Sequence, residues 1–197
     1  MINLAQLVAR VPRPVLFAVA GLLQVGLIAT MVIDRARILR QGTEITLQAR
    51  PVDPRDIFRG DYVVLGYDIS TIPAGELKSM LQSERGPREP YVFVKLAPKP
   101  GGLYGVVSVH LEPVPVSGTE VLIRGHVTNW RWCGNCENLN IRYGLEKYFV
   151  PEGEGRELEQ ARNQGKLTIV AAVTPSGRSA IKRLLLDGKP VYDEPLF

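Results

Sequence analysis

Five glutamates in one short stretch are the first candidates for chemistry: Glu146, Glu152, Glu154, Glu157 and Glu159. Paired carboxylates can transfer protons during hydrolysis, and their oxygen atoms can bind Ca²⁺. The segment 151–155, Pro-Glu-Gly-Glu-Gly, indicates a loop before a short helix, and the helix dipole favours acids in a first turn. We therefore favour a structural role for these residues. A hydrolase that uses the carboxylates near Glu152 is the alternative.

Cys133 and Cys136 are a second candidate site, because the chain contains two cysteines in total. The pentapeptide Trp-Cys-Gly-Asn-Cys at 132–136 resembles the redox motif of thioredoxin-like oxidoreductases, in which the first cysteine begins a helix. Residues 137–143 instead alternate like a strand, and Glu137 disfavours a thiolate. A metal site formed by both cysteines, His126 and a carboxylate is another alternative. We favour a local disulfide, which fits an oxidising compartment; two free thiols are the remaining alternative.

Other catalytic arrangements find little support in the sequence. No serine lies shortly before Gly60 and Asp61, as a membrane-anchored serine–lysine peptidase would require, and Ser70 follows them. His110 and His126 both fall inside strand-like runs, which makes a Ser-His-Asp site hard to build. No glycine-rich phosphate loop follows a strand. We therefore expect no cofactor, and a non-enzymatic role is the more favoured one.

Alternation of apolar and polar residues predicts a mainly β domain, of α+β class, that forms a barrel or a sandwich. The predicted strands are 44–49, 61–69, 91–96, 103–111, 120–128, 138–143, 167–173 and 180–186. Turn signals separate them at 98–102, 117–118, 175–177 and 187–188, and the last predicts a hairpin before Val191. Two short helices are expected, one at 74–82 and one from about Gly155 to Arg162.

The segment Gly-Asp-Tyr-Val-Val-Leu-Gly-Tyr at 60–67 matches the signature of the GDYXXLXY protein family, which the chain resembles over about 44–190. A second segment at 143–153, Tyr-Gly-Leu-Glu-Lys-Tyr-Phe-Val-Pro-Glu-Gly, resembles the same family. The residues that carry the resemblance are Asp53, Arg55, Asp56, Arg59, Gly60, Asp61, Tyr62, Leu65, Tyr67, Tyr143, Gly144 and Glu152. The resemblance implies a membrane-anchored bacterial protein of unknown function whose relatives look like partners of multi-span membrane proteins. It implies no catalytic residue.

The signature also has a physical interpretation of its own. Gly60 permits a tight entry into a strand, and Asp61 can accept hydrogen bonds from backbone amides in that turn. The side chains of Val63, Leu65 and Tyr67 then point to one face of the strand. We favour a structural corner in which the neighbouring charged residues form a network. A ligand or partner surface made by the same charges is the alternative.

Residues 15–33 predict a transmembrane helix, because these 19 positions contain no charged residue. Such a helix is about 28 Å long, close to the thickness of the hydrocarbon core of a bilayer. Gln24 is its one strongly polar residue, and Gly21, Gly26 and Ala29 offer small surfaces for lateral helix contacts. A cleaved signal peptide or a buried soluble helix is the alternative, but no good cleavage site or lipoprotein cysteine follows.

The distribution of charge predicts the domain organisation and the topology. Five arginines and one aspartate in the first 40 residues account for the whole net charge of +4. We expect a tail at 1–14, the helix, a linker at 34–42 and a soluble domain at 43–197. The flanking charges favour a cytoplasmic N-terminus and an extracytoplasmic domain. The domain is formally neutral and has no basic stripe, so we expect no nucleic-acid binding.

These observations predict a single-pass protein of the cytoplasmic membrane that acts as an accessory or binding protein. Its bilayer contact is at 15–33, and its expected partner is another membrane protein. A hydrolase and a thiol or metal protein are the rival hypotheses. The sequence does not name the ligand or the partner.

Overall fold

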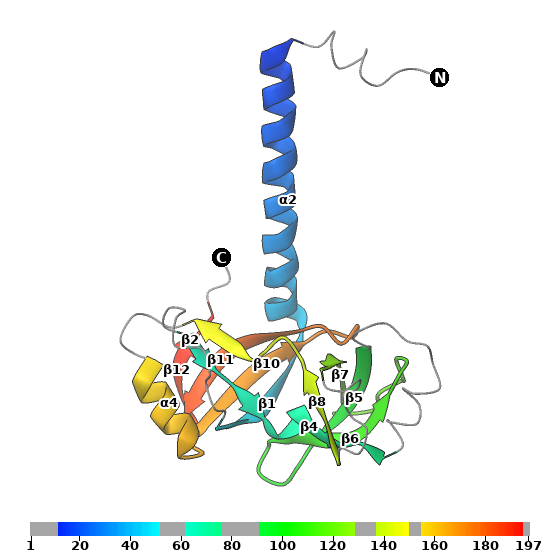
Figure 1. Ribbon diagram of the computed structural model, residues 1–197, viewed down its shortest axis with the longest axis vertical. Coiled ribbons are helices and arrows are strands. Elements are labelled where there is room, and N and C mark those ends of the chain that lie inside the picture. The colour runs from blue at the N-terminus through cyan, green and yellow to red at the C-terminus, as the bar shows by residue number, and fades with distance from the viewer. Residues whose placement is uncertain (1–11, 52–61, 76–90, 129–136, 150–154, 195–197) are drawn as a thin grey trace. The chain divides into compact units, whose positions relative to one another are not determined.

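The computed structural model describes residues 12–51, 62–75, 91–128, 137–149 and 155–194 of the chain (Figure 1). It contains two compact units, which divide between Arg37 and Ile38. The first unit contains most of a long helix, and the second contains a β-rich domain. We describe each unit by itself.

Helix α2 (Arg13–Gln41) contains the whole predicted transmembrane segment. Its apolar side chains are exposed, including Phe17 (77 % exposed) and Leu22 (73 %), so no protein surface covers them. The helix is long and apolar enough to cross a bilayer, and it fits a single-pass membrane anchor. Most of the segment that we expected as a linker continues the helix, because α2 ends only at Gln41.

The second unit is mainly β and confirms the predicted fold class. Its strands are β1 (Thr43–Arg50), β2 (Tyr62–Val64), β3 (Gly66–Tyr67), β4 (Thr71–Pro73), β5 (Tyr91–Pro98), β6 (Tyr104–His110), β7 (Val121–Val127), β8 (Asn138–Arg142), β9 (Lys147–Phe149), β10 (Leu167–Val173), β11 (Ser179–Leu186) and β12 (Lys189–Asp193). Helix α4 (Gly155–Asn163) confirms the second predicted helix. Apart from Ala74 and Gly75, the helix predicted at 74–82 lies outside the described residues.

Two five-stranded sheets form the domain, in the orders β12-β11-β10-β1-β3 and β4-β8-β7-β5-β6, with the pair β2-β9 beside them. All ladders between named strands are antiparallel, and bulges interrupt three of them. Because bulges increase local twist, they allow the sheets to curl into the half-barrel seen in Figure 1. One apolar core contains buried residues of both sheets, such as Ile45 of β1 and Val92 of β5.

The last turn of α2 is anchored to the first sheet. Ile38 and Leu39 are buried against Ala172 of β10 and Ala180 of β11. Two alanines leave room for these larger side chains, so the helix end packs directly on the sheet. The small cluster fixes the start of the domain at residues 38–42.

The strand predicted at 61–69 is wrong as a single element. The chain forms β2, leaves the ladder at Leu65, forms β3 and then enters a 3₁₀ turn, η1 (Asp68–Ser70). Strand β2 pairs with β9, whereas β3 pairs with β1. Alternation continues across the break because Leu65 and Tyr67 are both buried, so the sequence pattern did not reveal the change of partner.

Candidate functional site

The two signature segments lie side by side. Strand β2 of the first segment pairs with β9 of the second, with Val64 opposite Lys147. Immediately after β2, the backbone N–H of Leu65 donates to the carbonyl of Glu146 at 2.9 Å. The described parts of the two signature segments, which are far apart in the sequence, therefore form one structural region.

Two buried tyrosines exchange hydrogen bonds between the segments. Tyr67, which is 2 % exposed, donates from its hydroxyl to the carbonyl of Leu145 at 2.5 Å. Tyr143, which is 6 % exposed, donates in the opposite direction, to the carbonyl of Ile69 at 2.6 Å. Tyr67 therefore satisfies a backbone acceptor of the second segment, and Tyr143 satisfies one in η1, directly after the first segment.

Burial raises the pKa of both phenols, and the negative charge of Glu146 raises it further. The phenolate form is disfavoured because it would bring a charge into the apolar core. Tyr67 and Tyr143 therefore remain protonated donors, which suits hydrogen bonding and not acid–base chemistry near neutral pH.

Glu146 shapes the turn between β8 and β9. Its carboxylate accepts the backbone N–H of Tyr143 at 2.6 Å and that of Gly144 at 3.0 Å. Gly144 has a φ of +79°, a conformation that a side chain disfavours. Ser179 of β11 donates to the carbonyl of Tyr143 at 3.2 Å and connects this turn to the first sheet.

Arg162 of α4 is the one charged residue that is fully buried among those described, at 2 % exposed. Its guanidinium donates to the carbonyl of Val64, at the end of β2, and to the side-chain oxygen of Asn163 at 3.1 and 3.2 Å. Burial lowers the pKa of Arg162, whereas the charge of Glu159 raises it. The sequence analysis missed this residue, because a basic residue in the last turn of a helix is usually solvent-exposed.

We call Tyr67, Tyr143, Glu146 and Arg162 the signature cluster. Each of the four side chains forms a hydrogen bond with a backbone group of a nearby segment, so the cluster connects β2, β3, β9 and α4. In the part of the chain that the structure describes, no group of three or more His, Cys, Asp or Glu side chains could hold a metal ion. Among the described residues, these hydrogen bonds connect the two signature segments, which is the arrangement that the predicted structural corner requires.

Several predicted site residues lie outside the described residues: Asp53, Arg55, Asp56, Arg59, Gly60, Asp61, Cys133, Cys136, Glu152 and Glu154. The same holds for the side chains of Tyr62 and Glu157. The predicted charge network, the disulfide with its thiol and metal alternatives, and the carboxylate hydrolase therefore stay predictions. Leu65, Tyr67, Tyr143 and Gly144 are the signature residues that the structure brings together.

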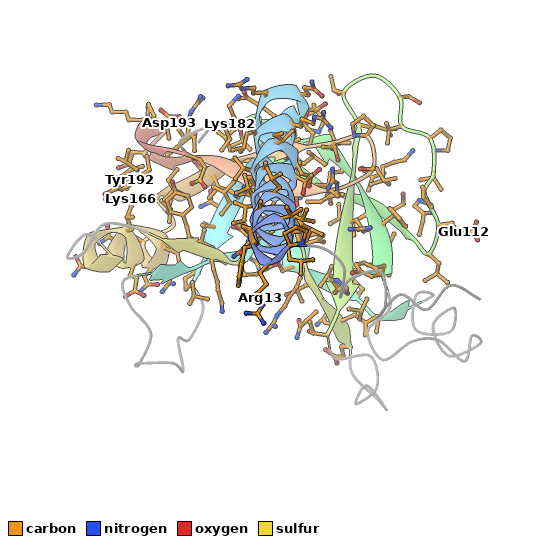
Figure 2. The ribbon with its side chains drawn as sticks, turned by 90° about the horizontal axis from the view of Figure 1, so that it is seen from above. Arg13, Glu112, Lys166, Lys182, Tyr192 and Asp193 are labelled. Carbon is orange, nitrogen blue, oxygen red and sulfur yellow. The ribbon has the colours of Figure 1, made fainter. Side chains whose placement is uncertain are left out.

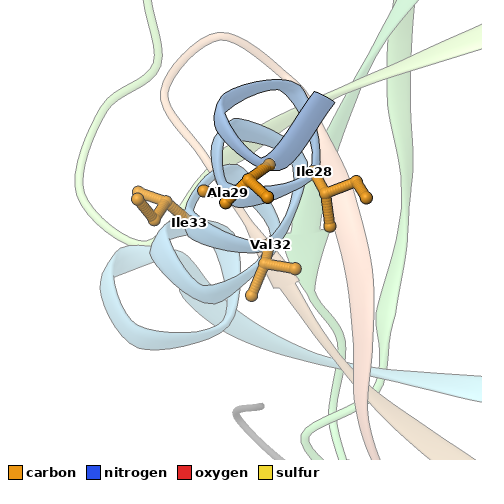
Figure 3. A pocket seen from close by; sticks show the side chains of 5 residues that line it. Ile28, Ala29, Val32 and Ile33 are labelled. Carbon is orange, nitrogen blue, oxygen red and sulfur yellow. The ribbon is translucent and has the colours of Figure 1, made fainter. Parts of the chain in front are cut away.

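A second feature lies on the membrane helix. A shallow apolar hollow on α2 is lined by Val25, Ile28, Ala29, Val32 and Ile33 (Figure 3). The small side chain of Ala29 lies among larger branched ones, which is the arrangement that accepts a side chain from a neighbouring helix. Gly21 and Gly26 have no other atoms within 4 Å of the position a side chain would take, so the helix is open there too.

An exposed apolar helix continuous with a curled β domain, in which two signature segments are hydrogen-bonded, defines a class of β-rich proteins with one long apolar helix. The chain belongs to the GDYXXLXY protein family, and the match extends over residues 24–184. The match begins inside α2 and ends in β11, so it covers both signature segments and most of the domain. No match was found among curated proteins or among solved structures.

Proposed function

We propose that this chain is a membrane-anchored accessory protein of the bacterial cytoplasmic membrane. Its β-rich domain would lie on the extracytoplasmic side and contact another membrane protein. The observation that carries the proposal is the continuity of an exposed apolar helix with a folded domain whose signature residues are used for structure. A protein of this design would keep a folded domain close to the membrane surface.

The hollow on α2 supports a membrane-protein partner. Helices in a bilayer associate through close packing, because lipid already solvates their apolar side chains. A hollow centred on Ala29 would let a neighbouring helix approach more closely than a uniformly bulky surface would. The same helix can therefore act both as anchor and as a contact for the partner.

The topology is tested with two reporters fused separately after Phe197. Alkaline phosphatase folds to an active form only outside the cytoplasm. Green fluorescent protein, in contrast, fluoresces only when it stays in the cytoplasm and not when it is exported through the general secretion pathway. We expect phosphatase activity without fluorescence. Fluorescence without phosphatase activity would reverse the orientation and overturn the extracytoplasmic part of the proposal.

The partner is tested by detergent purification of the full-length protein after chemical crosslinking in cells. We expect a stoichiometric multi-span membrane protein, and we expect Ala29→Leu to reduce its recovery because the hollow is filled. Ala20→Leu is the matched control, since residue 20 lies on the opposite side of the helix. Equal recovery with both variants would exclude the hollow as the contact, and recovery of the chain alone would overturn the accessory role.

A further inference from the structure

The outer surface of the second sheet combines exposed aromatic rings with positive charge. On the inner strand β5, Val92, Val94 and Leu96 are fully buried, so the alternate side chains point away from the core. We call the resulting surface the basic face, and it consists of Tyr91, Phe93, His110, Arg124, His126 and Arg142. Both histidines of the chain lie on it.

The strand register makes these side chains neighbours across four strands. Tyr91 of β5 lies opposite His126 of β7, and His126 lies opposite Arg142 of β8. One step along β5, Phe93 lies between Arg124 of β7 and His110 of β6. Residues opposite each other in antiparallel strands have Cβ atoms about 5 Å apart, so the basic face is continuous.

The centre of the basic face is an exposed aromatic stack. Tyr91 is 47 % exposed, and the guanidinium carbon of Arg124 lies 4.8 Å from the centre of its ring. The ring centres of Tyr91 and His126 are 3.7 Å apart. The stack orders Arg124 beside an apolar surface and leaves its hydrogen-bond donors available.

The charges of the basic face lack acidic partners within the described ranges. No carboxylate forms an ion pair there with Arg124 or with Arg142, and Arg142 is exposed. At the other end of β5, Lys95 is paired with Glu120 at 3.1 Å. Among the described residues, no carboxylate therefore compensates the positive charge around Tyr91 and Phe93.

The first sheet shows that this chain does pair its surface charges elsewhere. Lys182 donates to Glu44 at 2.7 Å, and Arg183 donates to Asp193 at 2.6 Å. Figure 2 shows Lys182 and Asp193 near each other on this part of the domain. The lack of pairing on the basic face is a property of that face and not of the whole surface.

We propose that the basic face binds an extended acidic segment of a partner protein. The inference rests on the proposed function and deepens it, because it names the surface and the chemistry of the contact. Carboxylates would form charge-assisted hydrogen bonds with Arg124 and Arg142, and apolar side chains of the segment would pack on Tyr91 and Phe93. Tyrosine and arginine are the residue types that contribute most to protein interfaces.

A protein segment fits this face better than other anions. Along β5, Tyr91 and Phe93 are two residues apart, so the side chains of the face recur with the same period as alternate residues of an extended chain. Residues 41–197 are formally neutral, so the positive charge of the basic face is local and matches a short acidic segment better than a long polyanion such as nucleic acid. The exposed rings would give an acidic peptide apolar contact that a bare phosphate could not use.

The test uses full-length protein in detergent and a fluorescein-labelled peptide of Glu-Glu-Tyr repeats, followed by fluorescence anisotropy. A peptide of Gln-Gln-Tyr repeats is the neutral reference and should bind at least about tenfold more weakly. The double variant Arg124→Gln/Arg142→Gln should weaken binding of the acidic peptide about tenfold. Lys182→Gln/Arg183→Gln removes the same charge from the paired surface and should change binding less than about twofold.

Arg142→Gln alone keeps the test valid if the double variant does not fold, and it should weaken binding about threefold. Equal losses in the two double variants, or equal binding of the two peptides, would overturn the proposal. Displacement of the peptide by glycerol phosphate or by single-stranded oligothymidine at equal charge would assign the face to lipid headgroups or nucleic acid instead. Failure of peptide binding with a partner still recovered would refute this face and leave the proposed function intact.

Discussion

The signature cluster and the basic face place similar residues in opposite situations. In the signature cluster, two tyrosines, a glutamate and an arginine are hydrogen-bonded inside the domain. On the basic face, a tyrosine and two arginines lie at or near the surface, and no acid pairs with them in the described part of the chain. The same types of side chain thus form internal hydrogen bonds in one region and lie at or near the surface in the other.

The difference separates residues that define the family from residues that offer a contact. In the described part of the second signature segment, Tyr143, Leu145 and Glu146 form hydrogen bonds with residues 65–69, so these polar groups are occupied within the domain. The basic face is built on strands whose opposite side forms the core, so its side chains point away from that core. A functional surface need not coincide with the motif that identifies a family.

The largest expected effect compares the same substitution in the two regions. Tyr67→Ala should lower the free energy of unfolding of the domain by about 4 kcal/mol, because it leaves a cavity in the core and an unpaired carbonyl at Leu145. Tyr91→Ala should cost less than about 1 kcal/mol, because its ring is half exposed. Urea denaturation of both variants in the same detergent measures the difference. Similar losses of unfolding free energy in the two variants would contradict the distinction between the signature cluster and the basic face.

Removal of the hydroxyls alone should have the next largest effect. Tyr67→Phe and Tyr143→Phe each leave a buried carbonyl without its donor, and each should cost about 2 kcal/mol. Tyr91→Phe is the matched control and should leave stability unchanged within about 0.5 kcal/mol. A loss in the control as large as that in the core variants would contradict the hydrogen-bond assignment.

The same two tyrosines predict how stability depends on alkaline pH. Their folded-state pKa values are raised, so the folded protein keeps protons that the unfolded chain releases above the ordinary phenol pKa of about 10. The free energy of unfolding should therefore fall as pH rises above about 10, by about 1.4 kcal/mol per pH unit for each tyrosine. The Tyr67→Phe/Tyr143→Phe variant should show a shallower decline, and equal slopes would refute the assignment.

Local pattern in the sequence was enough for most of the β domain. Alternation placed β5, β7 and β10 within two residues of their observed ends, and the Asp-Gly turn after β11 forms with φ of 47° and 78°. It could not show that the chain changes sheets at Leu65, because the amide of Leu65 bonds to a carbonyl far along the chain. Hydrogen-bond partners of this kind depend on tertiary pairing and not on local periodicity.

Neither the signature cluster nor the basic face could be predicted from the sequence, and the reason is the same for both. Arg162 reads as an ordinary solvent-facing residue of a short helix, and its burial depends on where β2 ends. His110 and His126 lie apart in the sequence, and the metal site that the sequence suggests includes His126 alone. Their common face follows from the register of β6, β5 and β7, which no short segment encodes.

A smaller effect should separate the carboxylate of the signature cluster from a carboxylate at the surface. Glu146→Gln keeps the shape of the side chain but leaves one acceptor for two backbone amides, so it should cost about 1 kcal/mol. Glu120→Gln is the matched control. Glu120 accepts bonds from Lys95 and from the amide of Ser117 at the surface, where water can replace them, so its loss should be smaller. Thermal unfolding in low salt measures both, and a larger loss for Glu120→Gln would reverse the order.

The smallest effect tests whether surface pairing itself distinguishes the two sheets. Lys182→Gln removes one partner of an ion pair with Glu44 and should cost about 0.5 kcal/mol in low salt. Arg142→Gln removes a charge without a carboxylate partner among the described residues, so it should cost nothing measurable and can relieve repulsion from Arg124. High salt should abolish the difference, because it screens exposed charges. A loss at Arg142 that equals the loss at Lys182 would mean that an acid compensates it, and the basic face would then be closed as well.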